Sequence, residues 1–244
     1  MPCSSCDSGD PLQAQYSKVV AIVAAAGSGK RAGKTTPKQF LEISGKPIFI
    51  HTLGKFDLCR EVDEVLLVVQ PDQMKNAEKS IDKYHIQKVK KMVEGGPERQ
   101  HSVRNGIDKI TEGTTIVVIH DAVRPFVSVE KITEVIQMAK KEGAAILAIP
   151  VKNTIKSGAD GWVKETLKRE SLWSVQTPQA FQIDWIKKAY KKADEDNIFA
   201  TDDALLIERL GYPIKIVQGE EQNLKITSAM DLFMAEKWMN EASR

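Results

Sequence analysis

Short apolar runs recur along the chain, and a longer segment of mixed polarity follows most of them. The apolar runs are long enough for buried strands, and they lie at 19–23, 64–69, 115–119 and 144–149. Two further strands are predicted at 88–94 and 213–217. Predicted helices lie at 47–59, 72–84, 98–110, 129–142, 184–193, 202–210 and 228–241. Continuous apolar strands alternating with helices are typical of an α/β fold, here a Rossmann-like, mostly parallel sheet sandwiched by helices.

This alternation stops between residues 151 and 176. Residues 152–156 and 162–167 are predicted to be two strands of a β-hairpin, joined by a glycine-rich turn. The hairpin is too polar for a core, and an isolated hairpin is only marginally stable in water. We therefore expect an extended β-hairpin arm over about 150–176 that leans on another surface, for which a second subunit is the candidate. Residues 18–244 are predicted to form a single domain that carries this arm.

Composition and charge exclude several classes of protein. The 244 residues carry 35 basic and 33 acidic side chains, and a net charge of +2 gives no overall field that would attract nucleic acid. No apolar run is long enough to cross a bilayer. Residues 1–17 lack the basic start and apolar centre of a signal peptide and are expected to be a disordered extension.

Three cysteines make no disulfide framework, so a reducing, cytoplasmic location is expected. Cys3 and Cys6 have zinc-like spacing, but no second Cys/His pair follows, so no zinc site is predicted.

Candidate chemistry is concentrated after the first apolar run. The sequence AAAGSG at 24–29 allows the backbone to approach a ligand, because these residues are small and glycine tolerates positive φ. Consecutive N–H groups in such a loop can converge on an anion. Four cations follow closely: Lys30, Arg31, Lys34 and Lys38. A strand, a glycine loop and clustered positive charge together predict a polyphosphate site.

Three motifs compete for this loop. A Walker A motif needs a glycine at the position of Ser28, so that match fails by one residue. The dinucleotide-binding fingerprint is met by Gly27, Gly29 and Ala32, but Pro37 opposes the unbroken helix that should follow. The third motif, Ala-Gly-x-Gly-x-Arg followed by Pro-Lys, is the nucleotidyltransferase loop, and all of it is present. The sequence favours this third interpretation and leaves the other two open.

Further segments that follow predicted strands resemble one family. They are GGPERQHSV at 95–103, HDAVRP at 120–125, RESLWSVQTPQ at 169–179, ATDDA at 200–204 and NLKIT at 223–227. Together with the glycine loop, they closely resemble the 2-C-methyl-D-erythritol 4-phosphate cytidylyltransferase family, enzymes of the non-mevalonate isoprenoid route. The resemblance runs from about residue 19 to the last predicted helix. Pro97 and Asn153 depart from the residues that are usual in the family.

The resemblance implies that a substrate phosphate oxygen attacks the α-phosphorus of CTP and expels pyrophosphate. Two anions must meet, so catalysis of this kind is positioning plus charge neutralisation. Arg31 and Lys38 are the implied catalytic cations. The residues implied in nucleotide binding are Ala25, Ala26, Gly27, Ser28, Gly29, Gly95, Gly96, Ser102 and Lys225. Those implied in substrate binding are Asp121, Arg124, Thr154, Arg169 and Thr201. The resemblance also implies that the arm carries Thr154 and Arg169 to the partner of a homodimer.

Asp121 is also the candidate metal ligand. It directly follows a predicted buried strand, and magnesium usually takes one or two protein carboxylates besides phosphate oxygens. Mg²⁺ or another divalent cation is therefore the expected cofactor, and a cap of a helix or turn is the alternative role of this carboxylate. Asp202 and Asp203 are expected mainly to cap the helix that follows them.

Three alternatives remain open at this point. Ribitol-5-phosphate cytidylyltransferase shares several of the motifs, although the segments at 169–179 and 223–227 favour the erythritol enzyme. A non-catalytic nucleotide-binding protein on the same scaffold is disfavoured, because the implied catalytic residues are intact. A Walker-type NTPase would need the glycine that Ser28 replaces. The expected partners are CTP and a polyol phosphate, with neither nucleic acid nor a membrane.

Overall fold

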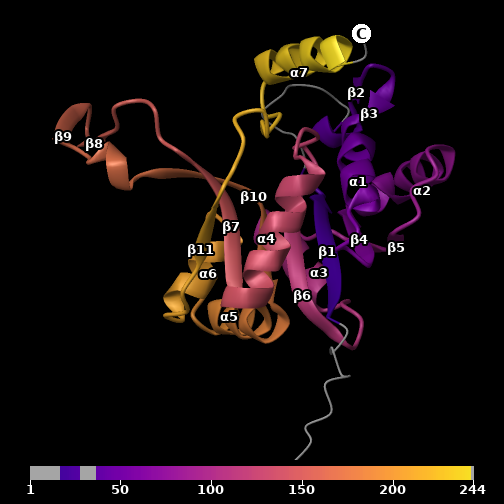
Figure 1. Ribbon diagram of the computed structural model, residues 1–244, viewed down its shortest axis with the longest axis horizontal. Helices are drawn as coiled ribbons and strands as arrows, with labels where there is room; N and C mark the ends of the chain where they lie inside the picture. Colours follow the sequence, from indigo (N-terminus) through magenta and orange to yellow (C-terminus); the bar gives the residue numbers. More distant parts are fainter. Residues whose placement is uncertain (1–16, 28–36, 243–244) are drawn as a thin grey trace, which may run out of the picture.

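One seven-stranded sheet organises the fold (Figure 1). The computed structural model describes residues 17–27 and 37–242. The strands are β1 (Lys18–Ala25), β4 (Glu64–Val69), β5 (Val89–Glu94), β6 (Thr114–Asp121), β7 (Ala144–Pro150), β10 (Trp173–Gln182) and β11 (Lys215–Gln218). Their order across the sheet is β11-β7-β10-β6-β1-β4-β5. Neighbours run parallel except β10, which is antiparallel to both β6 and β7. The predicted α/β fold with a mostly parallel sheet is confirmed.

Helices cover both faces of the sheet. The face that receives Val19, Ala21 and Val23 packs against α1 (Ile48–Leu58), α2 (Met74–Lys83) and α4 (Val129–Glu142). The face that receives Val20 and Ile22 packs against α3 (Arg99–Ile107), α5 (Ile183–Glu195) and α6 (Asp203–Arg209). Successive side chains of a strand point to opposite faces, so a strand covered on both sides must be apolar throughout. This explains why the buried strands were visible in the sequence as continuous apolar runs.

The ends of α4 follow local chemistry and match the prediction. Ser128 is the N-cap, and its side chain accepts a hydrogen bond of 3.2 Å from the backbone N–H of Lys131. Gly143 follows the last turn with φ of 91°, a backbone conformation that favours glycine. The sequence therefore specifies where this helix begins and ends.

Strand β10 was not predicted from the sequence. It begins at Trp173, inside the segment that was expected to belong to the arm, and it inserts between β6 and β7. Gln176, Thr177 and Gln179 are polar but buried. Hydrogen bonds to neighbouring segments compensate their side chains for the loss of water. The sequence of this strand shows no alternation of apolar and polar residues, so only its pairing with β6 and β7 in the structure identifies it as a strand.

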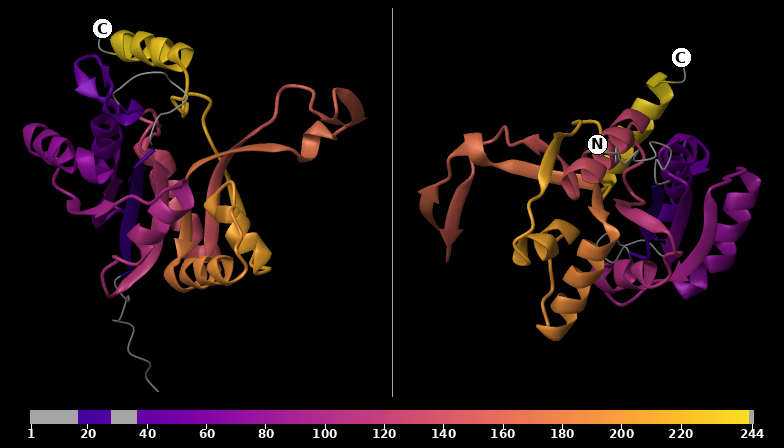
Figure 2. Two further views of the ribbon diagram at one scale, coloured as in Figure 1. Left: turned by 180° about the vertical axis from the view of Figure 1, so that it is seen from behind. Right: turned by 60° about the horizontal axis from the view of Figure 1, so that its bottom comes forward.

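The hairpin arm is present but shorter than predicted. Its strands are β8 (Lys156–Ala159) and β9 (Trp162–Thr166), whereas residues 152–155 were wrongly expected to be strand. Asp160 and Gly161 both have positive φ, as a two-residue hairpin turn requires. Figures 1 and 2 show the arm projecting away from the sheet. Trp162 is 80% exposed, so the arm leaves a large apolar side chain in solvent.

A small third layer lies beyond the carboxyl ends of β1 and β4. Helix α7 (Ala229–Ala242) lies there (Figure 1), close to the ribbon of β2 (Glu42–Ile43) and β3 (Lys46–Pro47). A separate apolar cluster of Ile43, Ile48, Ile226 and Ala235 joins these elements. This packing brings residues 225–227 over the edge of the sheet at which β1 and β6 end. Among the described residues, no helix is both long enough and apolar enough to span a membrane.

Candidate active site

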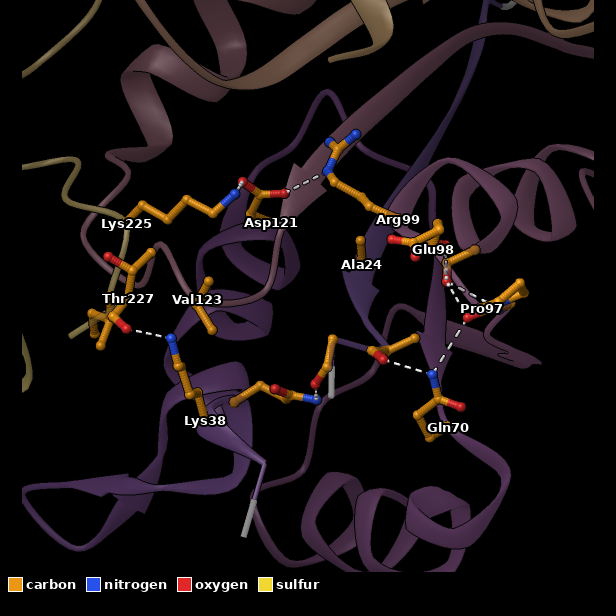
Figure 3. Close-up of a pocket in the computed structure, with 16 residues that line it drawn as sticks. Ala24, Lys38, Gln70, Pro97, Glu98, Arg99, Asp121, Val123, Lys225 and Thr227 are labelled. Carbon is orange, nitrogen blue, oxygen red and sulfur yellow. Dashed lines mark hydrogen bonds and ion pairs between the residues drawn. The ribbon is translucent and has the colours of Figure 1, made fainter. Parts of the chain in front are cut away.

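A pocket of about 670 Å³ opens at the carboxyl ends of β1 and β6 (Figure 3). Segments far apart in the chain line it: the end of β1, the turn after β5, the end of β6 and residues 225–227. Ligands of parallel α/β sheets bind at this edge because the loops after the strands meet there. The pocket therefore lies where the sequence predicted the chemistry.

A glycine turn forms one wall of the pocket. A Cβ on Gly95 would lie 2.2 Å from Cβ of Ala26, so only glycine lets the turn after β5 approach the loop after β1 this closely. Ser102 holds the turn, because its Oγ accepts from Gly96 N at 3.0 Å and donates to Glu98 O at 3.0 Å. The carbonyl and N–H groups of this turn are the kind of fixed polar groups that can read a base edge.

Two buried or half-buried glutamines fix the loop after β1. Gln70 Nε2 donates to Ala26 O at 2.7 Å. Gln39 Nε2 donates to the carbonyl oxygens of Ala25 and Gly27, the latter at 3.1 Å. These bonds satisfy the carbonyl groups of residues 25–27 and fix the path of the backbone there. Neither glutamine was singled out in the sequence.

Lys38 crosses the pocket in this structure. It begins the short 3-10 helix Lys38–Phe40, and its Nζ donates to Thr227 O on the opposite wall (Figure 3). No carboxylate of the described residues forms an ion pair with this ammonium group, which lies beside the pocket. A lysine held only by a carbonyl oxygen is available to an anionic ligand.

Asp121 is the electrostatic centre of the site. It is the last residue of β6, whereas the sequence analysis placed it after the end of the strand. Its Oδ1 lies 3.0 Å from Arg99 Nε, and its Oδ2 lies 2.8 Å from Lys225 Nζ and 3.6 Å from Arg124 Nε. Burial alone would raise the pKa of this carboxyl, but Arg99, Lys225 and Arg124 outweigh that effect and hold the pKa well below its usual range. Asp121 is therefore ionised.

Arg99 joins Asp121 to a second buried carboxylate. Its Nη2 lies 2.8 Å from Asp203 Oδ2, while Tyr190 Oη donates to Asp203 Oδ1 at 2.6 Å. Burial would lower the pKa of Arg99, but Asp203 and Asp121 raise it well above its ordinary value. The capping role expected of Asp203 is wrong, whereas Asp202 does cap α6 by accepting from Leu205 N at 3.2 Å.

The backbone of Asp121 is held from behind by β10. Its N–H donates to Thr177 Oγ1 at 3.1 Å, and that hydroxyl lies 3.1 Å from His120 Nδ1. Burial lowers the pKa of His120 to about 3, so the ring is neutral. Its Nε2 lies 3.2 Å from Arg124 O, which can only accept, so Nε2 carries the proton and Nδ1 accepts from Thr177. His120 is thus a structural link and not a proton shuttle.

Arg124 is held by the segment that leads to Lys225. Its Nη1 donates to Asn223 O at 2.7 Å. The buried Asn223 in turn donates through Nδ2 to Gln176 Oε1 at 3.1 Å and to Thr177 O at 2.8 Å. Burial lowers the pKa of Arg124, although Asp121 opposes that shift. The unpredicted strand β10 therefore supports both sides of the site.

The structure brings most of the predicted site residues together. Those that line the pocket are Ala26, Gly27, Lys38, Gly96, Ser102, Asp121 and Lys225. Ala25, Gly95 and Arg124 contact lining residues. Thr154 and Arg169 are exposed and lie on or at the base of the arm, and Thr201 is exposed just before α6. Ser28, Gly29 and the expected catalytic Arg31 lie outside the described residues.

Sequence reasoning missed Arg99. This residue stands inside the GGPERQHSV segment, but nothing in its local pattern shows that two carboxylates from distant helices and strands meet it. The available signal was its position at the start of the helix that follows a predicted strand.

Comparisons with known proteins agree with the site. The sequence profile described as IspD: 2-C-methyl-D-erythritol 4-phosphate cytidylyltransferase matches residues 19–241. A 2-C-methyl-D-erythritol 4-phosphate cytidylyltransferase from Syntrophus aciditrophicus is 46% identical over 226 residues, which are 92% of this chain and 97% of that protein. The crystal structure of 4-diphosphocytidyl-2C-methyl-D-erythritol synthase from Anaerococcus prevotii is similar with a TM-score of 0.83 and 30% identity, covering 92% of this chain and 96% of that one. A 2-C-methyl-D-erythritol 4-phosphate cytidylyltransferase from Thermus thermophilus has a TM-score of 0.75 and 31% identity, covering 92% and 99%. The family resemblance inferred from the sequence motifs is confirmed, and the chain belongs to the 2-C-methyl-D-erythritol 4-phosphate cytidylyltransferase family.

Proposed function

We propose that this chain transfers the cytidylyl group of CTP to 2-C-methyl-D-erythritol 4-phosphate. The reaction releases pyrophosphate and yields 4-diphosphocytidyl-2-C-methyl-D-erythritol, an intermediate of the non-mevalonate route to isoprenoids. The observation that carries the proposal is the convergence of Lys225, Arg99 and Arg124 on Asp121, beside a glycine turn at the carboxyl edge of the sheet. Family membership supports the same reaction.

The glycine turn is the proposed cytosine pocket. Selecting cytosine requires groups that accept from its amino group and donate to its ring acceptors, and backbone C=O and N–H groups supply both. Gly95 and Gly96 allow the base to approach the backbone, and Ser102 fixes the turn. The carbonyl-braced loop of Ala25, Ala26 and Gly27, continuing into Ser28 and Gly29, is proposed to bind the triphosphate.

Positive charge is proposed to supply most of the rate enhancement. Two phosphate groups repel each other as they approach, and preorganised cations reduce that repulsion without a large reorganisation cost. Lys38 and Lys225 line the pocket, and Arg31 follows the glycine loop in sequence. We assign Lys38 and Arg31 to the transferred and leaving phosphates, and Lys225 to the bound nucleotide.

Family members are nucleotidyltransferases, which generally depend on a divalent metal ion, and the residues of this site fit magnesium. No group of three or more His, Cys, Asp or Glu side chains in the described part of the chain could hold a metal ion by itself. Magnesium in nucleotide sites needs only one or two carboxylates, because phosphate oxygens complete its coordination. The ionised Asp121, which lines the pocket, is the proposed ligand, and bound Mg²⁺ would neutralise phosphate charge.

The arm is proposed to complete the site of a second subunit. Thr154 and Arg169 are exposed and do not line the pocket of their own chain, although Arg suits a phosphate through its forked donors. Exposed apolar side chains on the arm, above all Trp162, favour a buried position in an assembly. We therefore propose a homodimer of single nucleotidyltransferase domains, each of residues 18–244, in which Thr154 and Arg169 join Asp121, Arg124 and Thr201 around the substrate.

One assay tests the reaction. The protein is incubated with CTP, Mg²⁺ and either 2-C-methyl-D-erythritol 4-phosphate or ribitol 5-phosphate, and pyrophosphate release is followed together with the mass of the product. Turnover with the erythritol phosphate is expected. Faster turnover with ribitol 5-phosphate would instead support the alternative enzyme, and release of inorganic phosphate without any polyol would indicate an NTPase.

A second assay tests the arm. Arg169→Ala and Lys38→Ala are each expected to be nearly inactive, because they remove contributions to the same composite site. Mixed dimers should regain up to about a quarter of wild-type activity, since a random mixture gives one intact site in half of the dimers. No recovery after confirmed subunit exchange would contradict the crossing arm.

A further inference from the structure

We propose that Tyr190 and Asp203 are positioning residues for the reaction, which they influence through Arg99 and Asp121. The inference rests on the proposed function and adds two residues that do not touch the pocket. The series Tyr190–Asp203–Arg99–Asp121 holds one oxygen of the Asp121 carboxylate and leaves the other to Lys225 and Arg124 at the pocket.

The contacts form an unbroken series. Tyr190 Oη donates to Asp203 Oδ1 at 2.6 Å, and Arg99 Nη2 donates to the other oxygen of Asp203 at 2.8 Å. Arg99 then donates through Nε to Asp121 Oδ1 at 3.0 Å. The series thus runs from α5 through the starts of α6 and α3 to the end of β6. Each link is a direct hydrogen bond, and the last two are also ion pairs.

Burial makes the outer part of the series rigid. Tyr190 and Asp203 are each 1% exposed, so neither group can exchange its partner for water without opening the core. Arg99 is a planar, forked donor, and a carboxylate on each side fixes its orientation. Tyr190 does not line the pocket, yet its hydroxyl binds one oxygen of Asp203 and leaves the other oxygen to Arg99.

The two oxygens of Asp121 consequently differ. Oδ1 pairs with Arg99, as Figure 3 shows, and Arg99 is anchored on its other side by Asp203. Oδ2 is 3.6 Å from Arg124 Nε and 2.8 Å from Lys225, a lysine whose side chain is 40% exposed and carried on a flexible stem. Lys225 can move toward a bound phosphate, whereas Arg99 cannot move without breaking its pair with Asp203. Oδ2 is therefore the oxygen that a movement of Lys225 would make available to the substrates.

Tyr190→Phe tests this series of hydrogen bonds by removing one buried hydroxyl. We expect kcat to fall by about tenfold, because misplacement of a catalytic group by less than 1 Å has effects of this order. KM for CTP should change by less than about twofold, since the proposed base pocket does not contact Tyr190. Ile186→Val is the matched control, because Ile186 lies on the same helix, is fully buried and makes none of these contacts. Rates are measured with saturating Mg²⁺, well below the melting temperature of each variant.

A double-mutant cycle separates positioning from loss of stability. Arg99→Lys keeps the charge but cannot bridge two carboxylates with a fork, so Tyr190→Phe should lower kcat little further in that background. Multiplicative effects of the two changes, or a kcat of Tyr190→Phe equal to that of Ile186→Val, would overturn the inference. Failure of the wild-type protein to use any polyol phosphate would overturn the proposed function instead, so the two failures are distinguishable.

Discussion

Asp121→Asn is the substitution with the clearest consequence for both stability and activity. The change keeps the volume of the side chain and removes the negative charge that three cations share. The side chains of Asp121 and Arg124 are 8% and 11% exposed, so the change leaves a buried guanidinium without its counter-ion. Breaking a buried pair from one side costs about 3–5 kcal/mol, but Arg99 keeps Asp203 and Lys225 can turn to solvent, so we expect a loss of about 2–3 kcal/mol.

The loss depends on pH in a direction that the site dictates. Burial acts to raise the pKa of Asp121, but Arg99, Lys225 and Arg124 lower it on balance, so folding lowers this pKa. The unfolded chain then binds more protons, and the contribution of the charge is present above the unfolded pKa of ~3.9 and is lost as the pH falls toward the folded value. The difference in unfolding free energy between the wild type and Asp121→Asn should therefore shrink by roughly 0.7 kcal/mol from about pH 7 to about pH 3.5.

Urea unfolding of both proteins at the two pH values provides the measurement. Asp108→Asn is the matched control, because Asp108 is paired with Arg104 at the surface and its side chain is 55% exposed. That control should lose less than about 0.5 kcal/mol. Turnover by Asp121→Asn should fall by about 100-fold or more, as expected when a preorganised charge is lost from an active site. Wild-type stability of Asp121→Asn at pH 7, or a difference that grows as the pH falls, would refute the reasoning.

Three further substitutions test the walls of the pocket. Lys38→Ala should lower kcat by about 100-fold or more with a smaller change in CTP affinity, because its charge is needed mainly in the transition state; near-normal steady-state turnover would contradict this role. Ser102→Ala leaves the N–H of Gly96 without its 3.0 Å acceptor and should raise KM for CTP by about tenfold, whereas an unchanged KM would separate the turn from base binding. Gly95→Ala places a methyl group 2.2 Å from Ala26 Cβ, so calorimetry should detect CTP binding at least about tenfold weaker. Binding of wild-type strength would show that the two loops can separate freely.

The sequence identified the alternation of strands and helices and the edge of the sheet that carries the site. Strands such as Glu64–Val69 were readable because burial on both faces requires uninterrupted apolar residues. The limits of α4 were readable because Ser128 and Gly143 satisfy the ends of the helix locally. Motif order then indicated the family, since loops after parallel strands converge on one edge.

Tertiary structure alone decided how the buried polar groups pair. Strand β10 could not be recognised in the sequence because three of its buried residues, Gln176, Thr177 and Gln179, are polar. Their burial is tolerated because their side chains are hydrogen-bonded to neighbouring segments. Asp203 was expected to cap a helix, yet it pairs with Arg99, 104 residues away in sequence. The periodicity of apolar residues in the sequence indicates which side chains are buried, because the hydrophobic effect acts on each position separately. The partner of a buried charge depends on distances between segments, and no local pattern in a sequence encodes those distances.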